Sequence, residues 1–126
     1  MIAPYLFSAL SEKKGWGIYT SKAIAANTII ESSPIILISI DDKKKLLETI
    51  LYNYVFDWEH EQAAIGMGFL SIYNHACPSN CEYFQDYKQR IMHIKSIRDI
   101  AAHEEITINY QGDYANDKPV WFELLD

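Results

Sequence analysis

The side chains most able to do chemistry gather in one stretch of the chain. It runs from Asn74 to Cys81 and reads Asn-His-Ala-Cys-Pro-Ser-Asn-Cys, which places an imidazole, amides and two thiols within eight residues. An apolar, aromatic segment, residues 68–73, leads directly into it. Apolar runs usually end in a simple turn containing one or two Gly, Asn or Asp residues. This density of polar groups therefore calls for a chemical or a structural explanation.

Soft metal ligands make a zinc site the first alternative. His75, Cys77, Cys81 and the later His93 could supply the four ligands of a tetrahedral site. The cysteines follow C-x3-C rather than the commoner C-x2-C, and the chain has no second pair. The order of residues also fails the zinc deaminase signature, in which a proline precedes the first cysteine. A small structural zinc protein stays an alternative, but the expectation is that no metal is bound.

The same residues allow two interpretations without a metal. A thiol and an imidazole can form a nucleophilic pair, although a separation of two residues, as between His75 and Cys77, seldom brings the ring onto the thiol. Alternatively, Asn74 and His75 satisfy buried backbone groups by side-chain hydrogen bonds. Taken alone, the stretch favours this structural role, so the rest of the sequence must decide.

Length and charge narrow the possible classes. A chain of 126 residues fits a single domain, residues 1–126. The net charge of −6 is opposite to that of most nucleic-acid binders, and it favours a basic partner by long-range steering. No run approaches the ~20 apolar residues of a membrane span, and two cysteines are too few for a secreted disulfide scaffold. We therefore expect an intracellular protein that contacts neither nucleic acid nor membrane directly.

Hydrophobic patterning predicts a mainly β domain with one helix. β-Branched and alternating runs indicate strands, at residues 1–10, 28–31, 35–40, 82–87, 90–97 and 104–110. The two runs at 82–97 are expected to form an antiparallel hairpin. Asp41 is expected to cap a helix over 42–53, whose apolar face carries Leu46, Leu47, Ile50 and Leu51. Two glycines around an aromatic at 15–17 predict a loop that turns sharply or approaches another group closely.

Three motifs follow one another in a characteristic order. They are Lys14-Gly15-Trp16-Gly17, then Asn74-His75-Ala76-Cys77-x-x-Asn80-Cys81, then Glu104-Glu105-Ile106-Thr107-Ile108-Asn109-Tyr110. In this order and spacing they resemble the signature of SET-domain protein-lysine methyltransferases, most of all the minimal stand-alone SET proteins of viruses and bacteria. The resemblance implies a SET-domain (β-clip) fold of several short curved sheets. It also implies a pseudoknot, in which residues 69–75 and the segment ending at Tyr110 thread through each other.

The resemblance also implies a function and a set of site residues. It implies methyl transfer from S-adenosylmethionine to a lysine amine of a basic protein or peptide, with a histone tail as one choice. The residues expected to bind the cofactor are Lys14, Gly15, Trp16, Gly17, Asn74 and His75, with Trp121 closing the site. Tyr110 matches the catalytic tyrosine and also lines the substrate site, together with Tyr54 and Ile108. A homodimer is possible.

Several departures from the family pattern bear on these expectations. The usual Cys-x-Pro-Asn is here Cys77-Pro78-Ser79-Asn80, which predicts a local change only. Ile108 stands where many members carry an aromatic that limits the number of methyl groups, so the product stays open. No cysteine follows Cys81, so a zinc-binding post-SET segment is not expected. The expectation is a single SET domain over residues 1–126 that also has no pre-SET segment. A catalytically silent SET module that binds a basic peptide is the alternative from the binding class.

Overall fold

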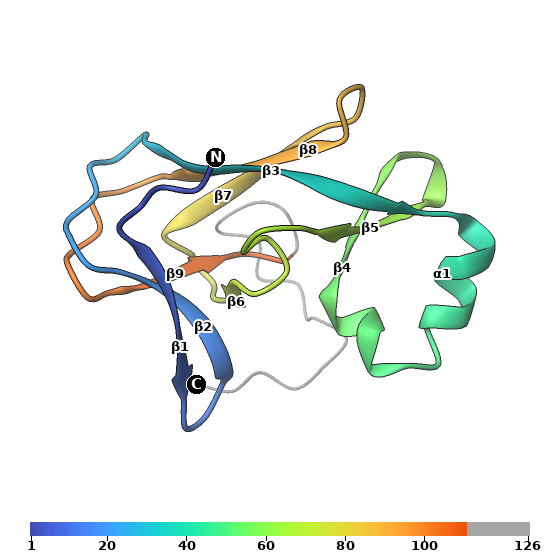
Figure 1. The fold of residues 1–126 in the computed structure, drawn as a ribbon, viewed down its shortest axis with the longest axis horizontal. Coiled ribbons are helices and arrows are strands. Elements are labelled where there is room, and N and C mark those ends of the chain that lie inside the picture. The colour runs from blue at the N-terminus through green and yellow to red at the C-terminus, as the bar shows by residue number, and fades with distance from the viewer. Residues whose placement is uncertain (111–126) are drawn as a thin grey trace.

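Short strands in two curved sheets form the framework of the molecule. The computed structural model describes residues 1–110 (Figure 1). One sheet has four strands in the order β1-β2-β9-β6, and the other has five in the order β4-β5-β3-β8-β7. The elements are β1 (Leu6–Ser11), β2 (Gly15–Thr20), β3 (Ile29–Ile38), α1 (Ile40–Leu46), η1 (Ile50–Tyr54), β4 (Val55–Asp57), η2 (Glu59–Glu61), β5 (Ala63–Gly66), β6 (Asn74–His75), β7 (Cys81–Asp86), β8 (Ile91–Ser96) and β9 (Glu105–Ile108). The predicted mainly β fold class is confirmed.

The four-stranded sheet joins segments that are distant in sequence. β1 and β2 form a hairpin, and β2 continues the sheet through an antiparallel pairing with β9. β9 also pairs in parallel with β6, where Asn74 faces Thr107 and His75 faces Ile108. This parallel pair lays the two segments of the expected pseudoknot side by side, near the centre of Figure 1.

The five-stranded sheet is built on β3, the longest strand. Its first half, through Pro34, pairs with β8, and its second half, from Ile35, pairs with β5. β7 and β8 form the predicted antiparallel hairpin. The two strands expected on either side of Ser33-Pro34 are one continuous strand. Proline is tolerated because it lies where one partner strand ends and the other begins, so its missing N–H removes no ladder bond.

Apolar residues on alternate positions of the strands form the core between the sheets. Ile106 and Ile108 of β9 are fully buried, as are Ile18 of β2 and Ile94 of β8. Side chains of a strand point alternately to its two faces, so the intervening Glu105 and Thr107 lie on the opposite face of β9. The period that buries Ile106 and Ile108 thus also directs Glu105 and Thr107 into the polar contacts described below.

Two local predictions were wrong in part. Residues 15–17 are not a loop but the start of β2, and the turn lies before them, where Ser11 Oγ accepts from Lys14 N at 3.0 Å. The helix is shorter than predicted, and Ser39 rather than Asp41 caps it by accepting from Asp42 N at 3.1 Å. The hydroxyl of Thr49 then bonds to the Leu46 carbonyl and accepts from Leu51 N. Such local side-chain bonds compete with a helix, and the chain continues as the 3₁₀ helix η1.

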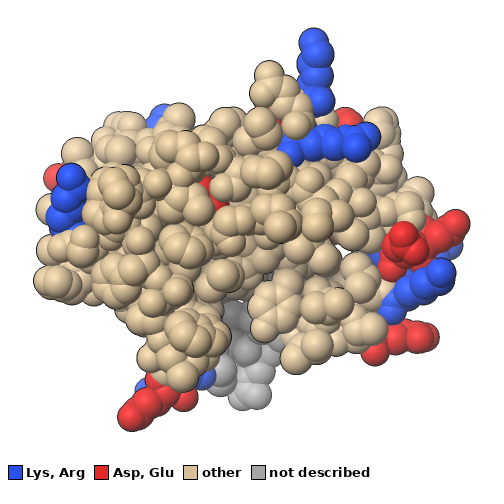
Figure 2. Space-filling model, viewed as in Figure 1, with Lys and Arg blue, Asp and Glu red and all other residues tan. Residues whose placement is uncertain are grey.

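The expected apolar face of this helix does not pack into the core. Leu47, Ile50 and Leu51 are exposed, and neither α1 nor η1 contains a buried residue. In Figure 2 charged side chains stand out at the end of the molecule that holds α1, at the β1–β2 turn, at the β7–β8 turn at the top and at the left edge, and most of the middle of that face is tan. None of the helices among residues 1–110 is long and apolar enough to cross a membrane.

Candidate functional site

The parallel pair of β6 and β9 brings the central motif and the third motif together. Besides the pairing of His75 with Ile108, the Ala76 amide donates to the Ile108 carbonyl at 3.1 Å. The chain after β9 therefore runs next to His75, and Tyr110 lies two residues beyond that contact. Residues that are 35 positions apart in the sequence meet here because two short strands pair.

His75 holds Tyr110 through the main chain. The Tyr110 amide donates to His75 Nδ1 at 3.0 Å, and the two ring centroids are 5.0 Å apart at an interplanar angle of 51°. Nδ1 can accept this bond only when it carries no proton, so the neutral ring has its proton on Nε2. Burial lowers the pKa of His75, and the nearby Lys14 ammonium lowers it further. The imidazole is thus kept in the neutral form that the contact needs.

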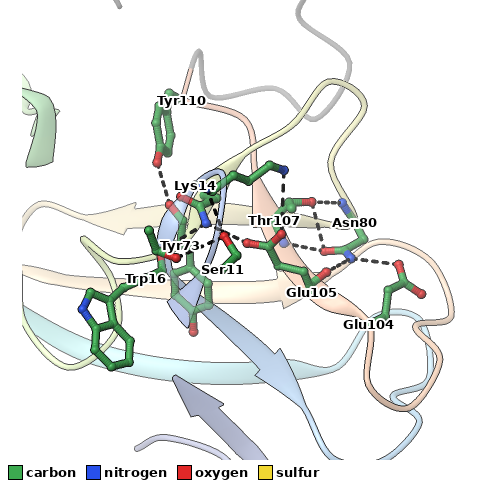
Figure 3. A network of polar contacts seen from close by, with 11 residues as sticks. Ser11, Lys14, Trp16, Tyr73, Asn80, Glu104, Glu105, Thr107 and Tyr110 are labelled. Carbon is green, nitrogen blue, oxygen red and sulfur yellow. Dashed lines mark hydrogen bonds and ion pairs between the residues drawn. The ribbon is translucent and has the colours of Figure 1, made fainter. Parts of the chain in front are cut away.

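The Tyr110 hydroxyl is fixed by a second contact. It donates to the backbone carbonyl of Tyr73 at 2.7 Å, as Figure 3 shows. Burial raises the pKa of Tyr110 above its ordinary value, and the neighbouring Tyr54 and Glu105 raise it further. The phenol therefore stays protonated at neutral pH. Its hydrogen is engaged by the Tyr73 carbonyl, so its oxygen can act as an acceptor.

Asn74 sits in a polar network next to this pair of rings. Its side-chain amide donates to the Trp16 carbonyl at 3.2 Å and to Glu105 Oε2 at 2.7 Å. The other oxygen of Glu105 is 3.7 Å from Lys14 Nζ. The network in Figure 3 thus joins β2, β6 and β9, one strand from each of the three motifs.

The first motif approaches this network with its backbone. A Cβ on Gly17 would lie 2.6 Å from Glu105 Oε2 and 2.9 Å from Asn74 Nδ2, so any side chain there would displace the ends of these two side chains. At Gly15, where φ is +71°, a Cβ would meet no atom of residues 1–110 within 4 Å. The strand is therefore closely packed against the network at Gly17 and borders open space at Gly15.

Asn80 fixes the loop that follows His75. Its side-chain oxygen accepts from Thr107 N at 2.9 Å, and its amide donates to the Glu105 carbonyl at 2.8 Å. A buried asparagine side chain thus pairs with the backbone of β9 as a neighbouring strand would. The shifted proline at position 78 leaves this pairing intact.

The remaining predicted site residues lie around this centre in different environments. Tyr54 is 47% exposed at the end of η1, and its carbonyl accepts from Ser71 Oγ at 2.9 Å. Ile108 is fully buried in the core. The Trp16 side chain is 59% exposed and points away from the network in Figure 3. Trp121 lies outside the residues that the structure describes.

The residues proposed as zinc ligands point to different partners. Cys81 is buried on β7, whereas Cys77 is exposed. His93 Nδ1 is 2.6 Å from Ser32 Oγ, and His75 Nδ1 is engaged by Tyr110. Among residues 1–110 no three His, Cys, Asp or Glu side chains converge as metal ligands would. Burial raises the pKa of the Cys81 thiol to about 12.

Three residues of the candidate site were not assigned a role from the sequence. Glu105 connects Lys14 with Asn74, Tyr73 supplies the carbonyl that holds Tyr110, and Asn80 pairs with β9. The alternation Glu105-Ile106-Thr107-Ile108 was the available signal for Glu105, because it directs that carboxylate away from the core. A backbone carbonyl such as that of Tyr73 leaves no signal in sequence.

Comparison with known families fits this geometry. The family model described as "SET domain" matches residues 15–111. The chain belongs to the SET-domain family. The matched range contains the first motif from Gly15 onward and both later motifs, and it therefore covers the network around Asn74, His75 and Tyr110 except for Lys14.

Two individual proteins extend this finding. A protein of Schizosaccharomyces pombe (strain 972 / ATCC 24843) described as "Histone-lysine N-methyltransferase, H3 lysine-37 specific" is 29% identical over 114 residues, which are 90% of this chain and 74% of that protein. The crystal structure of a Plasmodium falciparum protein described as a candidate histone methyltransferase has a TM-score of 0.64 and 23% identity, and the match covers 86% of this chain and 95% of that one. The structural match supports the SET-domain fold.

Proposed function

We propose that this SET domain is a protein-lysine N-methyltransferase that uses S-adenosylmethionine. Family membership and the S. pombe relative support the enzyme class. The observation that carries the proposal is the placement of Tyr110. Its hydroxyl is held by the Tyr73 carbonyl and its amide by His75, next to the network of Asn74, Glu105 and Lys14.

Residues from all three motifs fit the methionine part of such a cofactor. Lys14 and Glu105 offer a cation and a carboxylate for its carboxylate and ammonium groups, and Asn74 adds an amide. The open space at Gly15 allows a ligand to approach the backbone. The cofactor, when bound, supplies a methyl group on a positively charged sulfur, which a nucleophile can displace without acid catalysis.

The residues around Tyr110 suit the preparation of a lysine amine. An ammonium group has no lone pair, so it must lose its proton before it can attack. The rings of Tyr54 and Tyr110 provide apolar walls, and desolvation by such walls lowers the pKa of an entering lysine. Because the raised pKa of Tyr110 keeps it protonated, Tyr110 acts as an orienting acceptor rather than as the base. Holding the reacting atoms about 3–3.5 Å apart supplies much of the rate.

A basic protein is the substrate class that we propose, with histones as the first choice. The net charge of −6 favours encounter with a basic chain. The S. pombe relative is described as specific for a histone H3 lysine. With histones as substrates, the nucleus is the proposed compartment in a eukaryotic host.

Transfer of label tests the proposal. Purified protein is incubated with cofactor labelled on the methyl group and with a panel of core histones, histone-tail peptides and lysine-rich non-histone proteins. We expect label on lysine in at least one basic substrate, located by mass spectrometry. Calorimetry with the cofactor alone is the parallel measurement. Absence of both transfer and cofactor binding would refute the proposal, and peptide binding without transfer would favour a silent SET module.

A further inference from the structure

A buried carboxylate lies beneath the candidate site. Glu31, on β3, is fully buried. Its Oε1 accepts from the Tyr73 hydroxyl at 2.6 Å, and its Oε2 accepts from Ser33 Oγ at 2.7 Å and from Phe69 N at 2.9 Å. No Lys or Arg of residues 1–110 forms an ion pair with it. A buried charge is tolerated only when hydrogen bonds satisfy it, so Glu31 depends on these three donors.

These hydrogen bonds hold both ends of a single segment, residues 69–73. Phe69 N is its first donor group, and the Tyr73 hydroxyl is its last. Gly68 allows the close approach, because a Cβ at this position would overlap Glu31 Oε2. The segment is therefore fixed to β3 at its start and at its end by one side chain.

The segment of residues 69–73 ends at Tyr73, whose backbone carbonyl orients the Tyr110 hydroxyl. The carbonyl of Tyr73 accepts from the Tyr110 hydroxyl at 2.7 Å, and Asn74 and His75 follow directly in the chain. A displacement of Tyr73 would move the acceptor of Tyr110 and the start of β6 together. Misplacement by about 1 Å can reduce a rate by about 100-fold, so the position of this carbonyl matters for turnover.

We propose that Glu31 is a positioning residue for methyl transfer, acting through Tyr73 on Tyr110. The proposal rests on the proposed function. In this arrangement the Tyr73 side chain is anchored on Glu31 while its backbone carbonyl receives the Tyr110 hydroxyl. The Tyr110 oxygen then keeps one orientation toward the entering amine. Glu31 touches neither substrate nor cofactor, so its role is indirect.

A double-mutant cycle separates this role from simple support of the fold. Tyr73→Phe removes only the hydroxyl that donates to Glu31 and keeps the ring. With labelled S-adenosylmethionine and core histones, we expect Tyr73→Phe to lower kcat about tenfold with little change in the KM for the cofactor. In a Tyr110→Phe background, the same change should lower kcat by less than about twofold, because coupled residues are not additive.

One control and one measurement without turnover complete the test. Tyr83→Phe removes a phenol hydroxyl on β7, outside the contacts of Glu31. It should keep kcat within about twofold of the parent. Amide hydrogen exchange over residues 69–75 should be faster in Glu31→Gln and Tyr73→Phe than in Tyr83→Phe.

The outcomes are distinguishable. Equal effects of Tyr73→Phe in both backgrounds, or unchanged exchange over residues 69–75 in Glu31→Gln and Tyr73→Phe, would overturn the positioning role while leaving the methyltransferase assignment in place. A parent protein that neither binds the cofactor nor transfers methyl would reject the proposed function, and the positioning role with it. A cycle with the expected coupling and faster exchange supports the proposal.

Discussion

His75 connects the two halves of the candidate site through a single ring nitrogen. Its Nδ1 accepts from the Tyr110 amide, and it belongs to the short strand that pairs with β9. A proton on Nδ1 would replace this acceptor by a donor and would separate Tyr110 from β6. Burial and Lys14 both lower the pKa of His75, so the neutral ring and the contact persist below the pH at which an exposed histidine would be charged.

Gly17 offers the sharpest prediction at the residue scale. A Cβ there would lie within 3 Å of both Glu105 Oε2 and Asn74 Nδ2. We expect Gly17→Ala to displace this network and to weaken binding of S-adenosylmethionine at least tenfold, measured by calorimetry on folded protein. Gln89→Ala, in the exposed turn between β7 and β8, is the control. Equal cofactor affinity of Gly17→Ala and the parent would contradict the placement of the cofactor.

At the scale of elements, the site depends on how strands pair. β6 is two residues long, yet it adds the motif of residues 74–81 to the sheet that holds β2 and β9. So short a strand cannot be stable alone. The loop after it is fixed by Asn80, which forms hydrogen bonds with the backbone of both Glu105 and Thr107.

Asn80→Ala should therefore destabilise the fold measurably. The change leaves the Thr107 amide without its acceptor in the interior, and an unsatisfied buried group costs about 1–3 kcal/mol. Urea unfolding followed by circular dichroism measures the difference. Gln89→Ala, in the exposed turn between β7 and β8, should stay within about 0.5 kcal/mol of the parent. An Asn80→Ala protein as stable as the control would mean that the loop is held by other contacts.

Local patterns predicted part of these elements and missed the rest for physical reasons. Alternation identified the β7–β8 hairpin and β9, because each has one apolar face. Two glycines at 15–17 suggested a loop, but Gly17 is required by a side-chain contact from β6 and β9 within a strand. The apolar residues at 46–51 suggested one longer helix, and local hydroxyl contacts of Thr49 ended it earlier.

In the candidate site, too, the sequence predicted some contacts and missed others. Residues placed together by family motifs, such as Asn74, His75 and Tyr110, do meet in space. The contacts of Glu31 and Glu105 arise from pairing between distant strands, which single-sequence periodicity does not encode. The roles of these residues in cofactor and substrate binding stay predictions.

For the molecule as a whole, titrating groups predict a maximum of stability near neutral pH. His75 has a pKa below its ordinary 6.5, so the unfolded chain binds more protons there and stability falls as pH drops below about 6.5. For Glu104, burial raises the pKa, but hydrogen bonds from Arg98, the Ala101 amide and Asn80 outweigh it and lower the pKa below its ordinary 4.5. Its stabilisation is present above about pH 4.5 and is lost on acidification.

The loss of stability at alkaline pH comes from groups whose pKa is raised by folding. Burial raises the pKa of Tyr83 and of Cys81 to about 12. Burial and the charge of Glu31 also raise the pKa of Tyr73 well above its ordinary 10.0. The folded protein binds more protons than the unfolded chain in this range, so stability falls as pH rises above about 9. Urea midpoints between pH 4 and 11 should peak between about 6.5 and 9. A midpoint that rises steadily toward either extreme would contradict these environments.

The most direct test of the central claim compares Tyr110→Phe with the parent in two measurements on the same samples. One is calorimetric binding of S-adenosylmethionine, and the other is transfer of its labelled methyl group to core histone lysines. The geometry predicts that the cofactor binds with nearly unchanged affinity while transfer falls about 100-fold, because the hydroxyl held by the Tyr73 carbonyl is lost. Transfer at the parent rate by Tyr110→Phe would contradict the account.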